Sequence, residues 1–217
     1  MTSPEVELRR VWQRAVGRDH DRVLDALLER HREPHRRYHT ATHVMWVCRH
    51  VEQLALAHPV PDLDAVRVAA LFHDAVYDPR STTNEIDSAA LAVARLDELG
   101  WSTDRRIEVR RLIELTAGHV VDPADDAGAV LIDADLAILG ASPNEYQHYA
   151  TAVRAEYTHV DDVAWRTGRA RVLQHLLDQE AIFATATMRA ARQSSARANL
   201  TAELTSLRDR PVVWPVV

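Results

Sequence analysis

Two ionisable residues, His73 and Asp74, lie side by side in an apolar stretch of the chain. The run VRVAALFHDAVYD covers residues 66–78, and Asp78 follows the pair by one helical turn. An ionised carboxylate is costly to bury unless it is paired. A hydrogen-bond network or a divalent metal ion must therefore satisfy the pair, and for the pair taken alone the network is the simpler interpretation.

Other imidazole and carboxylate groups interrupt apolar runs in the same way. His39 and His43 are four residues apart in RRYHTATHVMWV, which places them on one face of a helix. Asp133 and Asp135 lie in AVLIDADLAIL, and His119 ends LTAGH. One shared site would satisfy several of these groups together. Mixed imidazole and carboxylate ligands suit a divalent metal ion, and the sequence leaves Mn, Mg, Co, Ni, Zn and Fe open.

The elements that must position these groups are helices. Apolar residues recur at helical spacing almost throughout, and no segment alternates as a strand would, so the pattern predicts an all-α fold. Ser3 and Gly100 are expected caps, and Asp78-Pro79 is expected to end one helix. The predicted helices cover residues 3–16, 19–31, 40–58, 62–78, 80–100, 102–119, 127–140, 142–160, 161–180 and 188–207.

Composition narrows the class of protein. A net charge of −6, from 32 acidic and 26 basic residues, does not suggest a nucleic-acid polymer as partner. No apolar run has the length needed to span a bilayer. Cys48, the single cysteine, is expected to be a buried hydrophobe, and the first residues lack a secretory signal. We therefore expect a cytoplasmic protein without a membrane partner.

The order His, His-Asp, Asp on successive helices resembles the HD superfamily of metal-dependent phosphohydrolases, whose members are all-α. The likeness is nearest to a bacterial branch of predicted HD-type phosphohydrolases. It runs from about Tyr38 to Leu204, and the segments that carry it are RRYHTATH, ALFHDAVYDP, NEIDSAA, LIDADLAILG, GRARVLQHLL and ARANLTAEL. It implies a single domain over residues 1–217. The HD core would cover about 38–140, helices at 143–208 would pack on it, and a tail would follow at 209–217.

The resemblance also implies a metal site between the central helices. Its ligands would be His43, His73, Asp74 and Asp135, with Asp133 as the alternative to Asp135. The implied reaction is hydrolysis of a small phosphoester, such as a nucleotide, by water that the metal activates.

Further roles are expected of residues that lie close to this site in the sequence, and for Glu85 the resemblance itself suggests one. The expected catalytic residues are Asp74, Glu85 and His119, and the expected substrate-binding residues are Arg37, His39, Tyr77, Asp78 and Arg80. Arginine can hold a phosphate through two hydrogen bonds. Structural alternatives stay open, because Glu85 could serve a helix N-terminus, His119 a helix C-terminus and Asp78 a cap.

Two functions other than phosphoester hydrolysis are also considered, an iron oxygenase and a nucleotide sensor. An iron oxygenase of the HD fold would need more histidines between the His-Asp pair and the last aspartate, where His119 stands alone. A non-catalytic nucleotide sensor would bind without turnover. The expected partner is a small molecule, and a homodimer is left open. Most other histidines, His31 among them, are expected at the surface or half-buried. The tryptophans, Trp46 among them, are expected in the core or as tail anchors.

Overall fold

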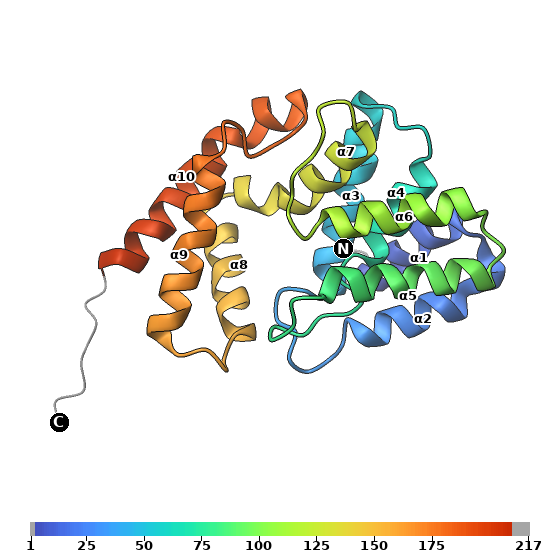
Figure 1. Ribbon diagram of the computed structural model, residues 1–217, viewed down its shortest axis with the longest axis horizontal. Helices are drawn as coiled ribbons and strands as arrows, with labels where there is room; N and C mark the ends of the chain where they lie inside the picture. Colours follow the sequence, from blue (N-terminus) through green and yellow to red (C-terminus); the bar gives the residue numbers. More distant parts are fainter. Residues whose placement is uncertain (1–2, 210–217) are drawn as a thin grey trace. The chain divides into compact units, whose positions relative to one another are not determined.

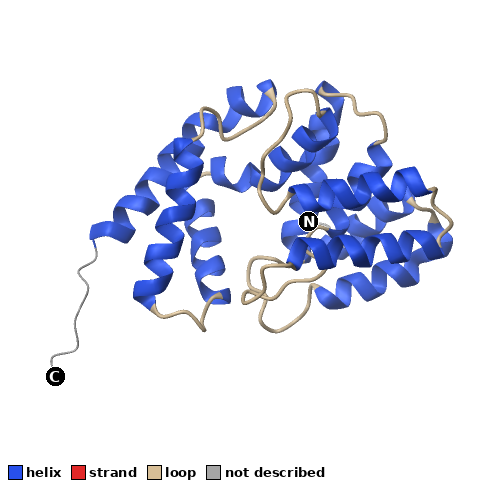
Figure 2. Cartoon of the chain, in the orientation of Figure 1, coloured by secondary structure: helices blue, strands red, loops and turns tan. Residues whose placement is uncertain are grey.

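The computed structural model describes residues 3–209, and these residues form ten α-helices, two short 3₁₀ helices and no strand (Figures 1 and 2). The predicted all-α fold is therefore confirmed. The chain divides into two compact units, one ending at Asp135 and one beginning at Leu136. Whether the chain is a single domain, as the sequence predicts, stays a prediction. Residues 210–217, which hold nearly all of the expected tail, lie outside the described part.

The first unit contains seven α-helices and one 3₁₀ helix. They are α1 (Pro4–Ala15), η1 (Arg18–His20), α2 (Asp21–Arg30), α3 (Ala41–Ala57), α4 (Leu63–Phe72), α5 (Asn84–Glu98), α6 (Thr103–Leu115) and α7 (Asp126–Asp135). Helix α1 packs on α2, α3 and α4. The two helices that precede residue 38 are thus part of the same unit as the expected HD core.

Helix α4 is the centre of this unit and contacts α1, α3, α5, α6 and α7. Its sequence LDAVRVAALF is apolar around most of its circumference, and every residue from Val68 to Phe72 is buried. A helix that is apolar on all sides must be covered on all sides. The residues that follow α4 consequently emerge from the core of the unit.

Several helix ends follow the sequence closely. The side chains of Ser3, Asp62 and Ser102 each accept a hydrogen bond from a main-chain N–H in the first turn of their helix. Gly100 has a φ of +73° just after α5, where a residue with a Cβ would be strained. These caps fix where α1, α4 and α6 begin and where α5 stops.

Several predicted helices were wrong in extent. Those expected over residues 80–100, 102–119 and 142–160 are shorter and cover Asn84–Glu98, Thr103–Leu115 and Pro143–Glu156. Two further differences concern the site. The helix expected over residues 62–78 ends at Phe72, so His73 and Asp74 lie in the turn after it. The helix expected over residues 127–140 is α-helical only to Asp135 and continues as a 3₁₀ helix. Trp46, expected in the core or as a tail anchor, is 46% exposed, with the Arg49 guanidinium over its ring. Cys48 is buried, as predicted.

The second unit contains η2 (Leu136–Gly140), α8 (Pro143–Glu156), α9 (Asp162–Asp178) and α10 (Ala186–Asp209). Helix α10 packs on η2 and α9. At Gly140 it approaches so closely that an added Cβ would lie 2.5 Å from the Cβ of Arg192. The Asn199 side chain donates to the carbonyl oxygens of Leu139 and Ala141, which fixes α10 against this turn.

The second unit also has a polar core. The guanidinium of Arg169 donates two hydrogen bonds, of 2.8 and 3.0 Å, to the carboxylate of Glu203, and the Tyr146 hydroxyl donates to the same carboxylate. Arg169 is buried and Glu203 is half-buried, and their pair joins α9 to α10. Within residues 3–209, no helix is both long enough and apolar enough to cross a membrane.

Candidate metal centre

Three elements of the first unit bring ligand-type side chains together. His43 lies in the first turn of α3, His73 directly follows α4, and Asp135 is the last residue of α7. One ligand atom from each residue lies within 4.8 Å of the other two. In the described part of the chain, this is the one group of three or more such side chains that could share a metal ion.

The distances within the group are short. The Nε2 atoms of His43 and His73 are 3.1 Å apart. The Asp135 Oδ1 atom lies 3.2 Å from the His43 nitrogen and 3.6 Å from the His73 nitrogen. Two ligands at about 2.0–2.2 Å from a common ion are separated by about 2.8–3.6 Å in tetrahedral or octahedral geometry. The observed spacing fits ligands that surround one ion.

Asp74 adjoins the two histidines of this group, although it is not one of the three members. Its Oδ2 atom lies 3.3 Å from the His43 Nε2 and 3.1 Å from the His73 Nε2. This oxygen is buried but accepts no hydrogen bond of adequate geometry within residues 3–209. A buried carboxylate oxygen normally has a hydrogen bond or a metal ion as partner. Asp74 therefore approaches both imidazoles as ligands approach a shared ion, and the residues present fit a divalent metal.

The charges of the group stabilise one another. Burial opposes the charge on His43, but the neighbouring carboxylates of Asp135 and Asp74 outweigh it and raise the pKa of His43 to about 10. Burial likewise opposes the charge on His73, and the neighbouring carboxylates still raise the pKa of His73. Burial alone would raise the pKa values of Asp74 and Asp135. The neighbouring imidazoles outweigh that effect and hold both values below their usual range. Without a metal, the site is a set of buried ion pairs.

Main-chain contacts orient the His73 ring. Its Nδ1 atom lies 2.9 Å from the carbonyl oxygen of Ala70, one turn earlier in α4. When Nδ1 carries the proton and donates it there, the lone pair of Nε2 faces the cluster. A hydrogen bond of this type, on the far nitrogen of a histidine, is the usual support for a metal ligand.

His119 extends the group at its exposed side. Its Nε2 atom lies 3.2 Å from Oδ2 of Asp135, the oxygen that does not face His43. The residue has a φ of +53°, in the left-handed region that favours glycine, and its side chain is 31% exposed. The expected position of His119 near the site is thus observed, while its catalytic role stays a prediction.

The turn that carries His73 and Asp74 is fastened to α5. The Ser88 hydroxyl accepts a hydrogen bond from the N–H of Val76 and donates to the carbonyl oxygen of the same residue. The Asn84 side chain makes the equivalent pair of hydrogen bonds with the main chain of Asp78. Ser88 is fully buried. These contacts replace the helical hydrogen bonds that the turn has given up.

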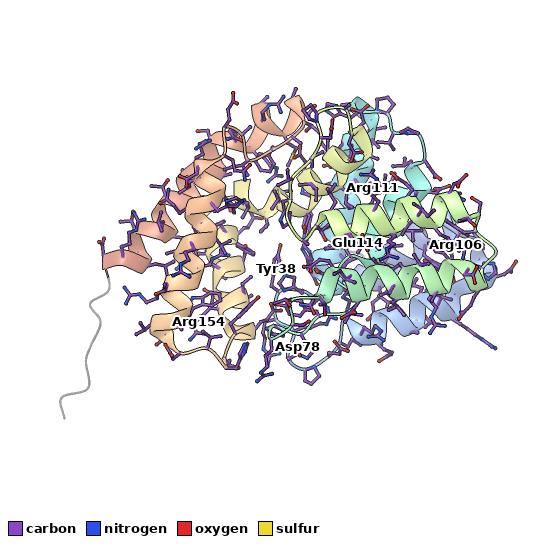
Figure 3. All side chains as sticks on the ribbon, in the orientation of Figure 1. Tyr38, Asp78, Arg106, Arg111, Glu114 and Arg154 are labelled. Atoms are coloured by element: carbon purple, nitrogen blue, oxygen red, sulfur yellow. The ribbon has the colours of Figure 1, made fainter. Side chains whose placement is uncertain are left out.

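Aromatic rings flank the cluster. The ring centroid of Tyr38 lies 4.7 Å from that of His43, and the centroid of His39 lies 5.8 Å from it. The ring of Tyr77 packs 4.2 Å from His39. Figure 3 labels Tyr38 and Asp78, which belong to the loops that precede α3 and follow α4. Of the expected substrate-binding residues, His39 therefore adjoins the metal group, and Tyr77 packs on His39.

The other expected residues have different surroundings. Arg37 is exposed and donates to the carbonyl oxygens of Pro34 and Arg36. Asp78 is exposed and accepts from the main-chain N–H of Arg80, as a turn residue does. Glu85 is half-buried in the first turn of α5 and, among the residues described, forms no hydrogen bond or ion pair with the cluster. The functions expected for these residues stay predictions.

The structure distinguishes Asp133 from Asp135 as a candidate metal ligand. Asp133 is fully buried, and it is not a member of the group formed by the two histidines and Asp135. The preference for Asp135 as the ligand therefore agrees with the geometry.

Sequence reasoning missed two buried residues beside the site. His31, expected at the surface or half-buried, is only 3% exposed, and its ring nitrogens make no hydrogen bond in the described part. Burial and the charge of Arg36 lower the pKa of His31 to about 3. The signal was present, because His31 continues the helical spacing of Leu24, Leu27 and Leu28 on the buried face of α2. Arg36 itself is buried and binds main-chain oxygens on both sides of the site.

Comparison of the chain with models of known protein families, with curated proteins and with solved structures gives no match. The resemblance to the HD superfamily accordingly rests on the sequence segments that carry it and stays a prediction.

Proposed function

We propose that the chain is a metal-dependent phosphohydrolase in which His43, His73, Asp74 and Asp135 hold a divalent metal ion. The observation that carries the proposal is the convergence of two imidazole nitrogens and two carboxylate oxygens at 3.1–3.6 Å contacts. The orphaned Oδ2 of Asp74 supports a metal over a simple hydrogen-bond network. The resemblance to the HD superfamily supports the same ligands and the same chemistry.

The charge of the proposed ligands suits a divalent ion. Two neutral imidazoles and two carboxylates bring two negative charges, so the loaded site has no net charge. A bound ion would supply a Lewis acid for a phosphoryl oxygen and would lower the pKa of water. Phosphoryl transfer depends mainly on positioning and on neutralisation of charge. Little further chemistry is then needed from the protein.

The remaining steps fall to side chains at the exposed side of the group. Attack of water on phosphorus breaks the ester P–O bond, releases one proton from the water and requires one proton at the leaving oxygen. We assign the first proton transfer to Asp74, with Glu85 as the second candidate. We assign the second to His119, whose ring is held by Asp135 and is partly exposed. His39 and Tyr77 would form the wall against which the phosphoester lies.

A matched pair of aspartate variants tests the ligand set. Asp135→Asn removes a ligand charge, whereas Asp133→Asn changes the same residue type two positions away. We expect Asp135→Asn to weaken metal affinity by at least about tenfold and Asp133→Asn to keep full metal stoichiometry. Metal content after dialysis and affinity by competition with a chelating dye provide the measurement. Equal losses in the two variants would reject the assignment of Asp135.

The reaction is tested on the wild-type protein with a panel of phosphoesters in the presence of Mn, Mg, Co or Ni. We expect phosphate release that requires the metal, is lost in Asp74→Ala and is retained in Asp104→Asn, which changes an exposed carboxylate on α6. Metal binding without any turnover would favour a nucleotide sensor. Oxygen consumption with bound iron would favour the oxygenase chemistry. Either outcome would exclude the phosphohydrolase.

A further inference from the structure

We infer that Arg36 is a positioning residue of the metal centre, because its buried guanidinium joins the two chain segments that carry three of the proposed ligands. This inference rests on the proposed metal site and extends it. Its position in the sequence beside the expected metal site singled out the neighbouring Arg37 as a phosphate contact, and no role was assigned to Arg36. The structure separates the two arginines sharply.

The contacts of Arg36 are almost all with main-chain oxygens. Its Nη1 atom donates to the carbonyl oxygen of His39, at 3.0 Å, and to that of Asp74, at 2.8 Å. Its Nη2 atom donates to the carbonyl oxygen of Ala75, at 3.3 Å, and its Nε atom donates to Glu33, at 3.0 Å. The side chain of Arg36 is fully buried. One nitrogen atom thus bridges the loop before α3 and the turn after α4.

Each end of this bridge lies next to a proposed ligand. The His39 carbonyl belongs to the loop that leads into the first turn of α3, where His43 is found. The Asp74 carbonyl belongs to a proposed ligand itself, and His73 precedes it. Two covalently separate segments must keep their imidazoles 3.1 Å apart. The guanidinium fixes the separation of their main chains at this point.

The chemistry of arginine suits this role. Its guanidinium stays charged at every accessible pH and offers five N–H donors in a rigid, planar fork. If the guanidinium is removed, these carbonyl oxygens lose its N–H donors, and the cost is greatest at the buried contact with Ala75. The hydrogen bonds of the bridge therefore do not depend on protonation of the histidines.

Arg36→Lys and Arg36→Met test the inference, with Arg37→Met as the matched control at an exposed neighbour. Lysine keeps the charge but ends one bond short of the guanidinium nitrogens. We measure the affinity for Co²⁺, the visible spectrum of bound Co²⁺, which reports ligand geometry, and the melting temperature. We expect Arg36→Met to lower the affinity about 10- to 100-fold and to alter the spectrum, and Arg36→Lys to lie between it and wild type.

The possible results distinguish a failure of the role inferred for Arg36 from a failure of the proposed metal site. A wild-type protein that binds no Co²⁺ would reject the metal site, and the inference with it. Wild-type Co²⁺ affinity and spectrum in folded Arg36→Met, even with a lower melting temperature, would show a purely structural residue and overturn the inference alone. Where Arg36→Met does not fold, Arg36→Lys decides, and an unchanged affinity and spectrum would overturn the inference. Arg37→Met is expected to match wild type, and a loss equal to that of Arg36→Met would also count against the bridge.

Discussion

The Nε2 atoms of His43 and His73 face each other at 3.1 Å, with carboxylate oxygens around them. Two protonated imidazoles repel each other in this arrangement, and only the carboxylates compensate. A metal ion requires both rings in their neutral form. Protons and metal therefore compete for the same four side chains, and this competition has a measurable pH dependence.

Binding of the metal is expected to release protons and to strengthen as pH rises from 6.5 towards 10. The pKa of His43 is about 10 in the metal-free fold against 6.5 for an ordinary histidine. A histidine whose pKa is higher in the folded than in the unfolded state stabilises the fold. The stabilisation is complete at pH values below the unfolded-state pKa, and it is lost as the pH rises through the folded-state pKa. The metal-free protein should thus lose stability between pH 6.5 and 10, by at least about 1.4 kcal/mol.

Urea unfolding at several pH values, with chelator or with bound metal, measures this difference. The metal-loaded protein should show no such loss over the same range, because its histidines are already neutral. Proton release on metal addition, followed with an indicator dye, gives an independent check. A metal affinity that is flat from pH 6.5 to 9, with no proton release, would contradict the ion pairs described for the metal-free site.

At the scale of elements, the start of a helix was easier to predict than its end near the site. Ser3 and Ser102 are capping residues whose local hydrogen bonds depend on a few neighbouring residues. The end of α4 at Phe72 depends instead on Ser88 and Arg36, which are distant in sequence and bind the main chain of the following turn. Periodicity cannot reveal such partners, because it reports only on the spacing of apolar residues within one segment.

Ser88→Ala is expected to destabilise the fold by about 1–3 kcal/mol, since it leaves the N–H and carbonyl groups of half-buried Val76 without their fully buried partner. Chemical denaturation measures the change, and Ala90→Ser, an exposed position on the same helix, provides a control of similar size. We expect Ala90→Ser to stay within about 0.5 kcal/mol of wild type. A loss no larger in Ser88→Ala than in Ala90→Ser would show that the turn holds without this contact.

The candidate site also shows this difference between features that neighbouring residues determine and features that residues distant in the sequence determine. Histidine and aspartate within apolar runs indicated His43, His73, Asp74 and Asp135, because a buried polar group needs a partner wherever it lies. The residues that hold these side chains in place were not indicated. Arg36 stands in a segment rich in charge, HREPHRRYH, which is typical of an exposed loop. Only the fold shows that one of its arginines is buried.

At the scale of the whole molecule, the two compact units have different kinds of polar interior. The candidate metal ligands all belong to the unit that ends at Asp135, whereas the unit that begins at Leu136 contains the ion pair of buried Arg169 with half-buried Glu203. Removal of one partner from a buried ion pair leaves an uncompensated charge. Because the ion pair and the candidate metal ligands belong to different units, a substitution in the ion pair is expected to lower stability without changing metal binding.

Glu203→Gln is expected to lower the free energy of unfolding by about 3 kcal/mol, because Arg169 loses the carboxylate that accepts two of its hydrogen bonds. Thermal and denaturant unfolding measure the loss. The metal content of the folded variant should equal that of wild type. The opposite result, intact stability with reduced metal content, would contradict the assignment of these residues to separate functions.

The preference of Arg36 for carbonyl oxygens has a consequence for the evolution of this site. Every amino acid has a main-chain carbonyl, so substitutions at positions 39, 74 and 75 leave the acceptors of the guanidinium in place. The hydrogen bonds of Arg36 to these main-chain oxygens do not depend on which side chains the three residues carry. A lineage could exchange a ligand at position 74 for a harder or softer one, and so change its preferred metal, without rebuilding the loops around it.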